Sequence, residues 1–232
     1  MLKLGSVYKN LVFLASIAGN YLVFVPLFRL MKRRYPSYAN SAANICIEGF
    51  PRCGNTFFVA AVQRWNPGLI VSHHSHLASS VSYSRRIGIP TVVLIREPAA
   101  AVSSAMVWDG KIVATIGLLV YISFYRGIRR AFPHVLILEF EEYTKNPDLA
   151  VERINIELGT NLKWVAFDAS EREAIQRYLT NHDSRNERVA SSSSLPNKEK
   201  AAQKQTYIAR VRGNGLFGAA RGLYESLTSS AS

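Results

Sequence analysis

Cysteine and acidic residues are both scarce in this chain of 232 residues. The two cysteines, Cys46 and Cys53, cannot build a disulfide framework, and no CxxC pair or Cys/His spacing indicates a zinc site. Only 16 Asp and Glu face 28 Lys and Arg, which gives a formal net charge of +12. This excess favours anionic partners such as nucleotides, sulfated substrates or an acidic membrane, and the alternative is a basic surface that maintains solubility.

Long uncharged apolar runs are also missing, with one exception near the N-terminus. Residues 11–28 (LVFLASIAGNYLVFVPLF) contain no charge and reach the lower length limit for a membrane span, although a glycine, an asparagine and a proline interrupt them. No cleavage site of a removable signal peptide precedes the basic cluster that follows. Residues 1–34 are therefore interpreted either as a segment that attaches a cytoplasmic protein to a membrane surface through residues 11–34, or as a helix packed on the domain.

The remaining chain, residues 44–232, has the pattern of one α/β domain. Its buried strands are expected where β-branched and apolar residues are continuous, because helices then cover both faces of a parallel sheet. The expected strands are Asn44–Glu48, Leu69–Ser72, Thr91–Ile95 and Val135–Phe140. The expected helices are Asn55–Trp65, Pro98–Trp108, Ile112–Ala131 and Pro147–Gly159. This alternation predicts a three-layer, doubly wound parallel sheet with a P-loop-like nucleotide-binding fold.

The C-terminal third is less regular. Ser170 with Glu173 forms a sequence capping box, which predicts the start of a further helix. Residues 190–205 (ASSSSLPNKEKAAQKQ) are polar and rich in serine and charge, so they are expected to form a mobile loop.

A glycine-containing loop joins the first expected strand to its helix, with the sequence Gly49–Thr56 (GFPRCGNT). A turn of this kind aims the unpaired N–H groups of a helix N-terminus at one point, which suits a phosphate. The ATP-binding pattern GxxxxGK[ST] needs a lysine where Asn55 stands, so ordinary ATP hydrolysis is disfavoured. Arg52 supplies a cation earlier in the loop instead. The alternative is a plain strand-to-helix turn.

A second anion site is expected after the strand Thr91–Ile95. Arg96 lies at the carboxyl end of this strand, where ligands bind in parallel sheets. Pro98 begins a helix, and Ser104 falls about two turns along it. The alternative is an arginine with a structural role and an incidental serine, and a shift of one residue would select Ser103.

Three histidines in four residues, His73, His74 and His76, follow the second expected strand. Without a neighbouring Cys, Asp or Glu, this spacing is weak support for a metal site. A neutral imidazole near pH 7 is the usual general base, and the alternative is an exposed or capping histidine.

These motifs resemble those of the sulfotransferase family. Its first signature, P-[KR]-S-G-[TN]-T-[WF], matches Pro51–Phe57, with arginine at 52 where lysine is commoner and cysteine at 53 where serine is usual. The resemblance assigns to the donor nucleotide Arg52, Cys53, Gly54, Asn55, Thr56 and Phe57. In the second signature, R-[ND]-P followed later by serine, Arg96 and Ser104 match and would hold the donor's 3′-phosphate, although Glu97 departs from the pattern.

The resemblance also assigns the proton acceptor. The family's [ST]-H-[LF] element matches Ser75–Leu77, which selects His76 over its two neighbours as the base. Phe140 would contact adenine, with a core phenylalanine as the alternative. Arg210, Arg212 and Gly213 resemble the family's R-K-G-x-x-G loop over the 3′-phosphate, although the tryptophan that usually follows is absent.

The resemblance implies transfer of a sulfuryl group from 3′-phosphoadenosine 5′-phosphosulfate to an acceptor hydroxyl or amine, with His76 and Arg52 as catalytic groups and no metal. The acceptor is a hydroxyl-bearing molecule of unknown class, and nucleic acid is not an expected partner, because no stacking module accompanies the basic clusters. Two alternatives stay open: a P-loop NTPase or kinase, and a catalytically inactive, membrane-associated protein that binds nucleotides.

Overall fold

A four-stranded, all-parallel sheet forms the centre of the computed structural model, which describes residues 10, 14, 15, 17, 20, 41–110, 112–130, 134–183 and 198–229. The strands are β1 (Ile45–Gly49), β2 (Val71–His73), β3 (Thr91–Ile95) and β4 (Leu136–Glu139). Their order across the sheet is β2-β1-β3-β4. Every residue of β1 and β3 is buried, which explains why their sequences are continuously apolar rather than alternating.

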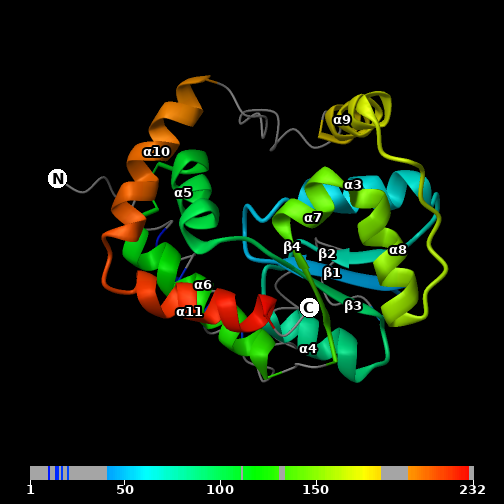
Figure 1. Cartoon of the computed structure of the whole chain (residues 1–232). Coiled ribbons are helices and arrows are strands. Elements are labelled where there is room, and N and C mark those ends of the chain that lie inside the picture. Colours follow the sequence, from blue (N-terminus) through cyan, green and yellow to red (C-terminus); the bar gives the residue numbers. More distant parts are fainter. Residues whose placement is uncertain are drawn as a thin grey trace.

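Helices flank this sheet, as Figure 1 shows. α3, α7 and α8 lie above the strands in that view, and α4, α6 and α11 lie below them. The helices are α3 (Asn55–Trp65), α4 (Ala78–Arg86), α5 (Pro98–Trp108), α6 (Ala114–Arg129), α7 (Phe140–Lys145), α8 (Pro147–Leu158), α9 (Ala169–Asp183), α10 (Lys198–Arg212) and α11 (Phe217–Thr228). The prediction of an α/β fold with a parallel sheet between helices is confirmed.

Two helix starts differ from the sequence prediction because other carboxylates cap them. Phe140 is the first residue of α7 rather than the end of a strand, since Glu139 and Glu142 form a reciprocal capping box there. α9 begins before Ser170, because Asp168 Oδ1 accepts the N–H of Glu171 at 2.8 Å and the hydroxyl of Ser170 at 2.9 Å. The predicted capping box of Ser170 and Glu173 is therefore wrong.

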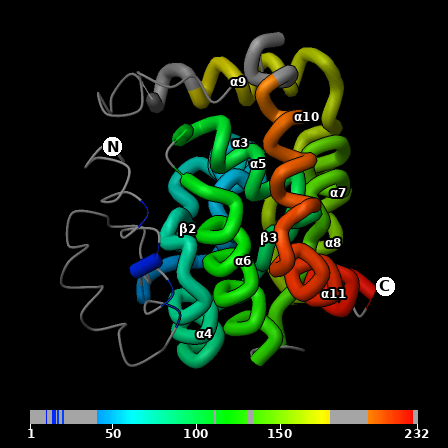
Figure 2. The backbone as a smooth tube through the Cα atoms, turned by 90° about the vertical axis from the view of Figure 1, so that its left-hand side faces the viewer, coloured from blue at the N-terminus to red at the C-terminus, as the bar shows by residue number. Residues whose placement is uncertain are grey.

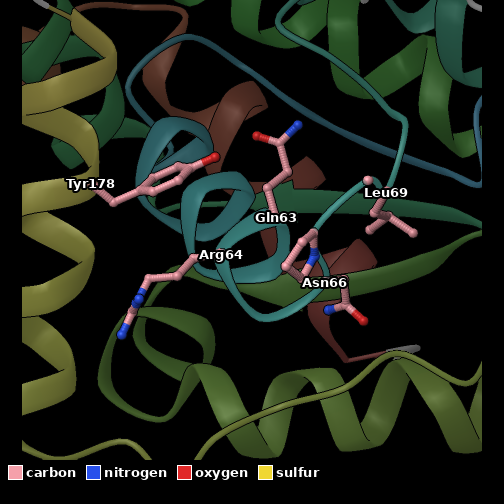
Figure 3. Close-up of a pocket in the computed structure, with 7 residues that line it drawn as sticks. Gln63, Arg64, Asn66, Leu69 and Tyr178 are labelled. Atoms are coloured by element: carbon pink, nitrogen blue, oxygen red, sulfur yellow. The ribbon is translucent and has the colours of Figure 1, made fainter.

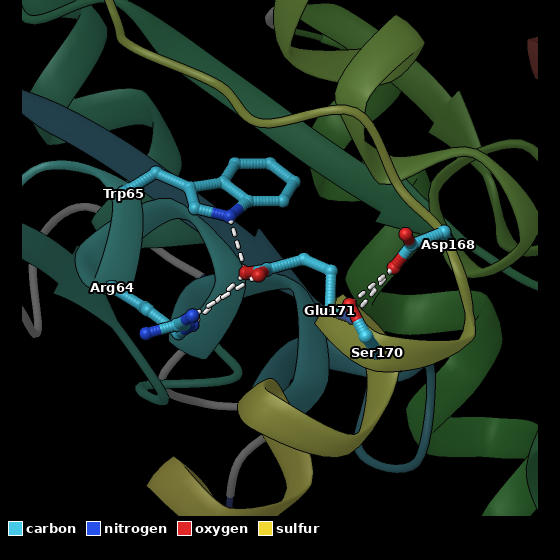
Figure 4. A network of polar contacts seen from close by, with 5 residues as sticks. All are labelled: Arg64, Trp65, Asp168, Ser170 and Glu171. Atoms are coloured by element: carbon cyan, nitrogen blue, oxygen red, sulfur yellow. Dashed lines mark hydrogen bonds and ion pairs between the residues drawn. The ribbon is translucent and has the colours of Figure 1, made fainter.

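A buried carboxylate fastens α9 to α3 (Figure 4). Glu171 is 7% exposed, and it accepts hydrogen bonds from Arg64 Nε at 2.9 Å and from Trp65 Nε1 at 2.8 Å. Burial alone would raise the pKa of Glu171, but the hydrogen bonds from Arg64 and Trp65 outweigh it and hold this pKa below its usual value. The Glu171 carboxylate is thus stabilised in its charged form.

The expected loop at residues 190–205 is helical in its second part, because α10 begins at Lys198; residues 190–197 lie outside the described residues. α10 packs along α5, as Figure 2 shows, whereas α9 lies on the opposite side of the molecule in Figure 1. Tertiary packing on α5 overrides the weak propensity of this polar segment.

Most of the apolar N-terminal segment lies outside the described residues. Of the described residues in it, Asn20 contacts the domain: its Nδ2 donates to Ser123 Oγ at 2.9 Å, and its Oδ1 accepts the N–H of Ala78 at 2.9 Å. Within the described part of the chain, no helix is both long enough and apolar enough to cross a membrane.

Candidate functional site

The candidate site lies where the order of the strands reverses. From β1 the chain crosses to β2 on one side and then to β3 on the other, so the carboxyl ends of β1 and β3 are neighbours, with Gly49 paired to Leu94. Ligands of doubly wound sheets bind in the crevice outside such a switch point. The glycine loop leaves β1 here, and Arg96 follows β3, so the structure brings the two expected anion-binding motifs together (Figure 1).

The glycine loop is closely packed against Leu94 of β3 and against Phe140 at the start of α7. A Cβ on Gly49 would lie 2.7 Å from the carbonyl oxygen of Leu94, and one on Gly54 would lie 3.1 Å from the Phe140 ring. Gly54 has a φ of 76° and directly precedes α3, a backbone conformation that favours glycine. The N–H groups of the first turn of α3 have no partner within the helix, so they are available to an anion at this end.

Asn55 occupies the position where a nucleotide-hydrolysing loop has lysine. Its Nδ2 donates to the carbonyl of Gly49 at 3.2 Å and lies 3.5 Å from that of Phe50. The side chain therefore turns back to close the loop. A role in reaching the outer phosphates of a nucleoside triphosphate does not fit this orientation.

Two arginines meet above the carboxyl ends of β1 and β3. Arg96 Nη1 donates to the main-chain carbonyl of Arg52 at 2.9 Å. Burial and then the charge of Arg96 lower the pKa of Arg52, and burial also lowers the pKa of Arg96. Among the described residues, neither arginine forms an ion pair, and Arg52 Nε is buried without a hydrogen-bond partner. Two close, half-buried cations of this kind favour an anion between them.

Aromatic rings orient both guanidinium groups. The guanidinium carbon of Arg96 lies 3.8 Å from the centre of the Phe140 ring, and that of Arg52 lies 5.9 Å from the Trp108 ring. Phe140 thus packs one ring face against Arg96 before any ligand arrives. A base contact by Phe140 would have to use the remaining face or edge of the ring.

A third cation, Lys204 of α10, belongs to the same region and was missed from the sequence. Burial and then the charge of Arg96 lower the pKa of Lys204, while the nearby carboxylates of Glu141 and Glu97 oppose that shift. Lys204 fell in the stretch that was interpreted as a mobile loop. Only the packing of α10 on α5 brings it close to Arg96.

His76 is hydrogen-bonded to Gly49, the first residue of the glycine loop. Its Nδ1 lies 2.7 Å from the carbonyl oxygen of Gly49, and since a carbonyl only accepts, Nδ1 carries the proton. The neutral ring therefore has its lone pair on Nε2. The buried carboxylate of Glu48 accepts the main-chain N–H groups of Ser75 at 2.8 Å and of His76 at 3.0 Å. This arrangement orients an imidazole as a proton acceptor.

The other two histidines have different surroundings. His74 Nε2 lies 3.1 Å from Thr56 Oγ1, at the exposed start of α3. Burial, and then the neighbouring His74 and His76, lower the pKa of His73 to about 3. His73 is therefore neutral at physiological pH. Within the described residues no group of three His, Cys, Asp or Glu side chains is placed to hold a metal ion.

Non-glycine residues with left-handed backbone gather at this site. Among the described residues they are Arg52, His74 and His76, with φ values of 70°, 59° and 54°. Each such residue costs about 1 kcal/mol or more, so the surrounding structure has to hold it in place.

Two loop residues assigned to the donor face elsewhere. The Cys53 side chain is fully buried, 3.5 Å from the hydroxyl of Tyr125, and burial raises its pKa to about 11. Cys53 can meet a ligand only through its main chain. Phe57 packs edge-on against Phe167, with ring centres 6.1 Å apart, on the side of α9.

The expected residues on α5 and α10 have mixed placements. Ser103 is fully buried and its hydroxyl donates to the carbonyl of Ala100 at 3.3 Å, whereas Ser104 is partly exposed, as a ligand contact requires. Arg210 and Arg212 are exposed residues in the last helical turn of α10, and Gly213 follows directly. Arg210, Arg212 and Gly213 were expected together in a loop, but the two arginines belong to helix α10.

A pocket elsewhere on the described structure is drawn in Figure 3. It has a volume of about 420 Å³ and lies between the C-terminal end of α3 and Tyr178, which extends from α9. α3 runs antiparallel to the strands, so this pocket sits at the amino edge of the sheet, opposite the glycine loop. Among the described residues, the glycine loop, the two arginines and His76 come together at the carboxyl edge instead. No protein-family model, no curated protein and no solved structure matches this chain.

Proposed function

We propose that this chain is a sulfotransferase that moves a sulfuryl group from 3′-phosphoadenosine 5′-phosphosulfate to an acceptor hydroxyl or amine. One observation carries the proposal. The glycine loop after β1, the arginine after β3 and a histidine with its tautomer set by Gly49 meet at one end of the sheet. This set supplies two anion contacts and one proton acceptor within a single crevice.

The donor would lie across the carboxyl ends of β1 and β3. Its 5′-phosphate would accept N–H groups from the first turn of α3, with Arg52 beside the bridging oxygen. Its 3′-phosphate would pair with Arg96, with Ser104 and Lys204 as further contacts. Because the three cations supply positive charge, this scheme needs no metal ion.

The transfer would be an in-line displacement at sulfur. His76 Nε2 accepts the proton of the acceptor hydroxyl while the acceptor oxygen forms a bond to sulfur. The bond between sulfur and the 5′-phosphate oxygen breaks, and adenosine 3′,5′-bisphosphate leaves with the electron pair. The carbonyl of Gly49 stabilises the imidazolium through Nδ1–H, and Arg52 stabilises the charge that grows on the leaving phosphate.

A ligand comparison tests this proposal. The full chain is melted with adenosine 3′,5′-bisphosphate, with ADP, and with ATP in the presence and absence of Mg²⁺. A ligand at a hundred times its dissociation constant adds about 2.7 kcal/mol of stability, so the bisphosphate is expected to raise the melting temperature without Mg²⁺. A shift with ATP and Mg²⁺ but none with the bisphosphate would overturn the proposal in favour of a P-loop NTPase or kinase.

A further inference from the structure

Three buried tyrosines hold the main chain beneath the two anion-binding segments. Tyr121 of α6 donates its hydroxyl to the carbonyl of Arg96 at 2.8 Å. Tyr125, one turn further on, donates to the carbonyl of Leu94 at 2.8 Å and lies 3.5 Å from Cys53 Sγ. Tyr143 of α7 donates to the carbonyl of Cys53. All three side chains are fully buried, and we call them the tyrosine clamp.

The clamp completes a pattern in the glycine loop, in which donors from outside the loop engage its carbonyl groups. Arg96 donates a hydrogen bond to the carbonyl of Arg52, and Tyr143 donates one to the carbonyl of Cys53. His76 donates one to the carbonyl of Gly49. A carbonyl oxygen turned toward the crevice would repel an anion. Hydrogen bonds to these oxygens reduce that repulsion and favour the loop conformation in which N–H groups face the ligand.

The clamp also connects the loop after β1 and the segment after β3 to two separate helices, α6 and α7. Tyr121 and Tyr125 are four residues apart on one face of α6, with ring centres 4.6 Å apart. Through them α6 contacts the end of β3 on both sides of Ile95 and, by way of Cys53, the loop after β1. Tyr143 fixes the same loop from α7, on the opposite face of the sheet.

We propose that Tyr121 and Tyr143 are positioning residues that preorganise the anion site by fixing the carbonyls of Arg96 and Cys53. This inference rests on the proposed function for the identity of the anion. Neither tyrosine needs to touch the ligand. Burial raises the pKa of both hydroxyls, so they stay protonated donors throughout the working pH range.

The matched control is Thr91 at the opposite end of β3. Its buried hydroxyl donates to the carbonyl of Ile89 at 2.7 Å, the same kind of hydrogen bond far from the crevice. Tyr121→Phe, Tyr143→Phe and Thr91→Val each remove one hydroxyl and keep the side-chain volume nearly unchanged. The four proteins are compared by melting, by titration with adenosine 3′,5′-bisphosphate, and by amide hydrogen exchange without ligand.

We expect all three variants to fold with similar losses of melting temperature. Tyr121→Phe and Tyr143→Phe should bind the bisphosphate about tenfold more weakly, whereas Thr91→Val should bind like the wild type. Without ligand, the amides of residues 50–56 and 96–100 should exchange faster in the two tyrosine variants than in Thr91→Val.

The outcomes separate this inference from the proposed function. If the wild type binds the bisphosphate and both tyrosine variants bind equally well, the positioning role is wrong and the proposed function stands. If the wild type does not bind it, the proposed function fails, and hydrogen exchange still decides the positioning role. If the amides of residues 50–56 and 96–100 exchange in the tyrosine variants as they do in Thr91→Val, the positioning role is overturned. Faster exchange that is confined to these two segments supports the positioning role.

Discussion

Arg96 stacks its guanidinium 3.8 Å from the centre of the Phe140 ring, and Phe140 is the first residue of the helix that follows β4. The strand β4 is the neighbour of β3 in the sheet, so one aromatic ring at the start of the helix after β4 packs on the cation that follows β3. The same guanidinium donates to the carbonyl of Arg52. Arg96 therefore depends on a planar, forked side chain rather than on charge alone.

Arg96→Lys should weaken binding of adenosine 3′,5′-bisphosphate by about tenfold or more, although the net charge is unchanged. A lysine keeps the charge but loses the stacked geometry and the bond to Arg52, and charge-assisted contacts are each worth about 1.5–3 kcal/mol. Calorimetric titration measures the effect. Arg86→Lys in the exposed last turn of α4 is the control, and equal losses in both variants would remove Arg96 from the site.

Lys204→Gln should also weaken binding of the bisphosphate, by about threefold to tenfold, since a half-buried Lys204, whose pKa is lowered by burial and then by the charge of Arg96, adds positive charge to this region. Lys163→Gln makes the same change in net charge at an exposed position on another part of the molecule. The two affinities are compared at low and at physiological ionic strength. If Lys163→Gln weakens binding as much, the effect comes from overall charge and not from Lys204.

His76→Asn should keep its affinity for the bisphosphate and lose about 10²–10⁴-fold in turnover, the usual share of a positioned acid–base group. Turnover is measured with labelled donor and an acceptor found by screening sugars, lipids and phenols that carry hydroxyl groups. His73→Asn and His74→Asn serve as comparisons and should have milder effects, because neither ring bonds to Gly49 in the described structure. Near-normal turnover in His76→Asn would place the base elsewhere.

Glu171 should make stability depend on pH in the acidic range. Its folded pKa lies below the unfolded value, which is about 4.3, so its stabilising effect is complete above that value and is lost as pH falls through the folded pKa. Glu171→Gln should destabilise the protein by about 1–2 kcal/mol at pH 7 and less at pH 3. Urea unfolding at both values measures this.

Glu157→Gln is the control for Glu171. Glu157 pairs with Arg153 on the surface of α8, and its side chain is 44% exposed, so its loss should change stability little at either pH. Equal effects of the two substitutions at pH 7 would mean that the contact between α3 and α9 contributes no more than a surface pair.

The sequence predicted best those elements whose ends carry local signals. α3 and α5 match their predicted bounds, because Gly54 and Pro98 mark where each helix begins. Lys204 and the tyrosine clamp could not be found in this way. Tyr143 bonds to Cys53 across 90 positions of sequence, and Lys204 enters the region of Arg96 because α10 packs on α5, so no local pattern encodes either placement.

The left-handed backbone of His74 has a cost in conformational energy at the candidate site. A glycine at this position would relieve the steric cost of its φ of 59°, so His74→Gly is a candidate for a more stable protein with a less ordered crevice. Among the described residues, Arg52 and His76 share this conformation, so the strained non-glycine backbone lies in the loop after β1 and the segment after β2. The part of the chain that is proposed to bind the anion therefore carries a conformational cost that the surrounding contacts have to offset.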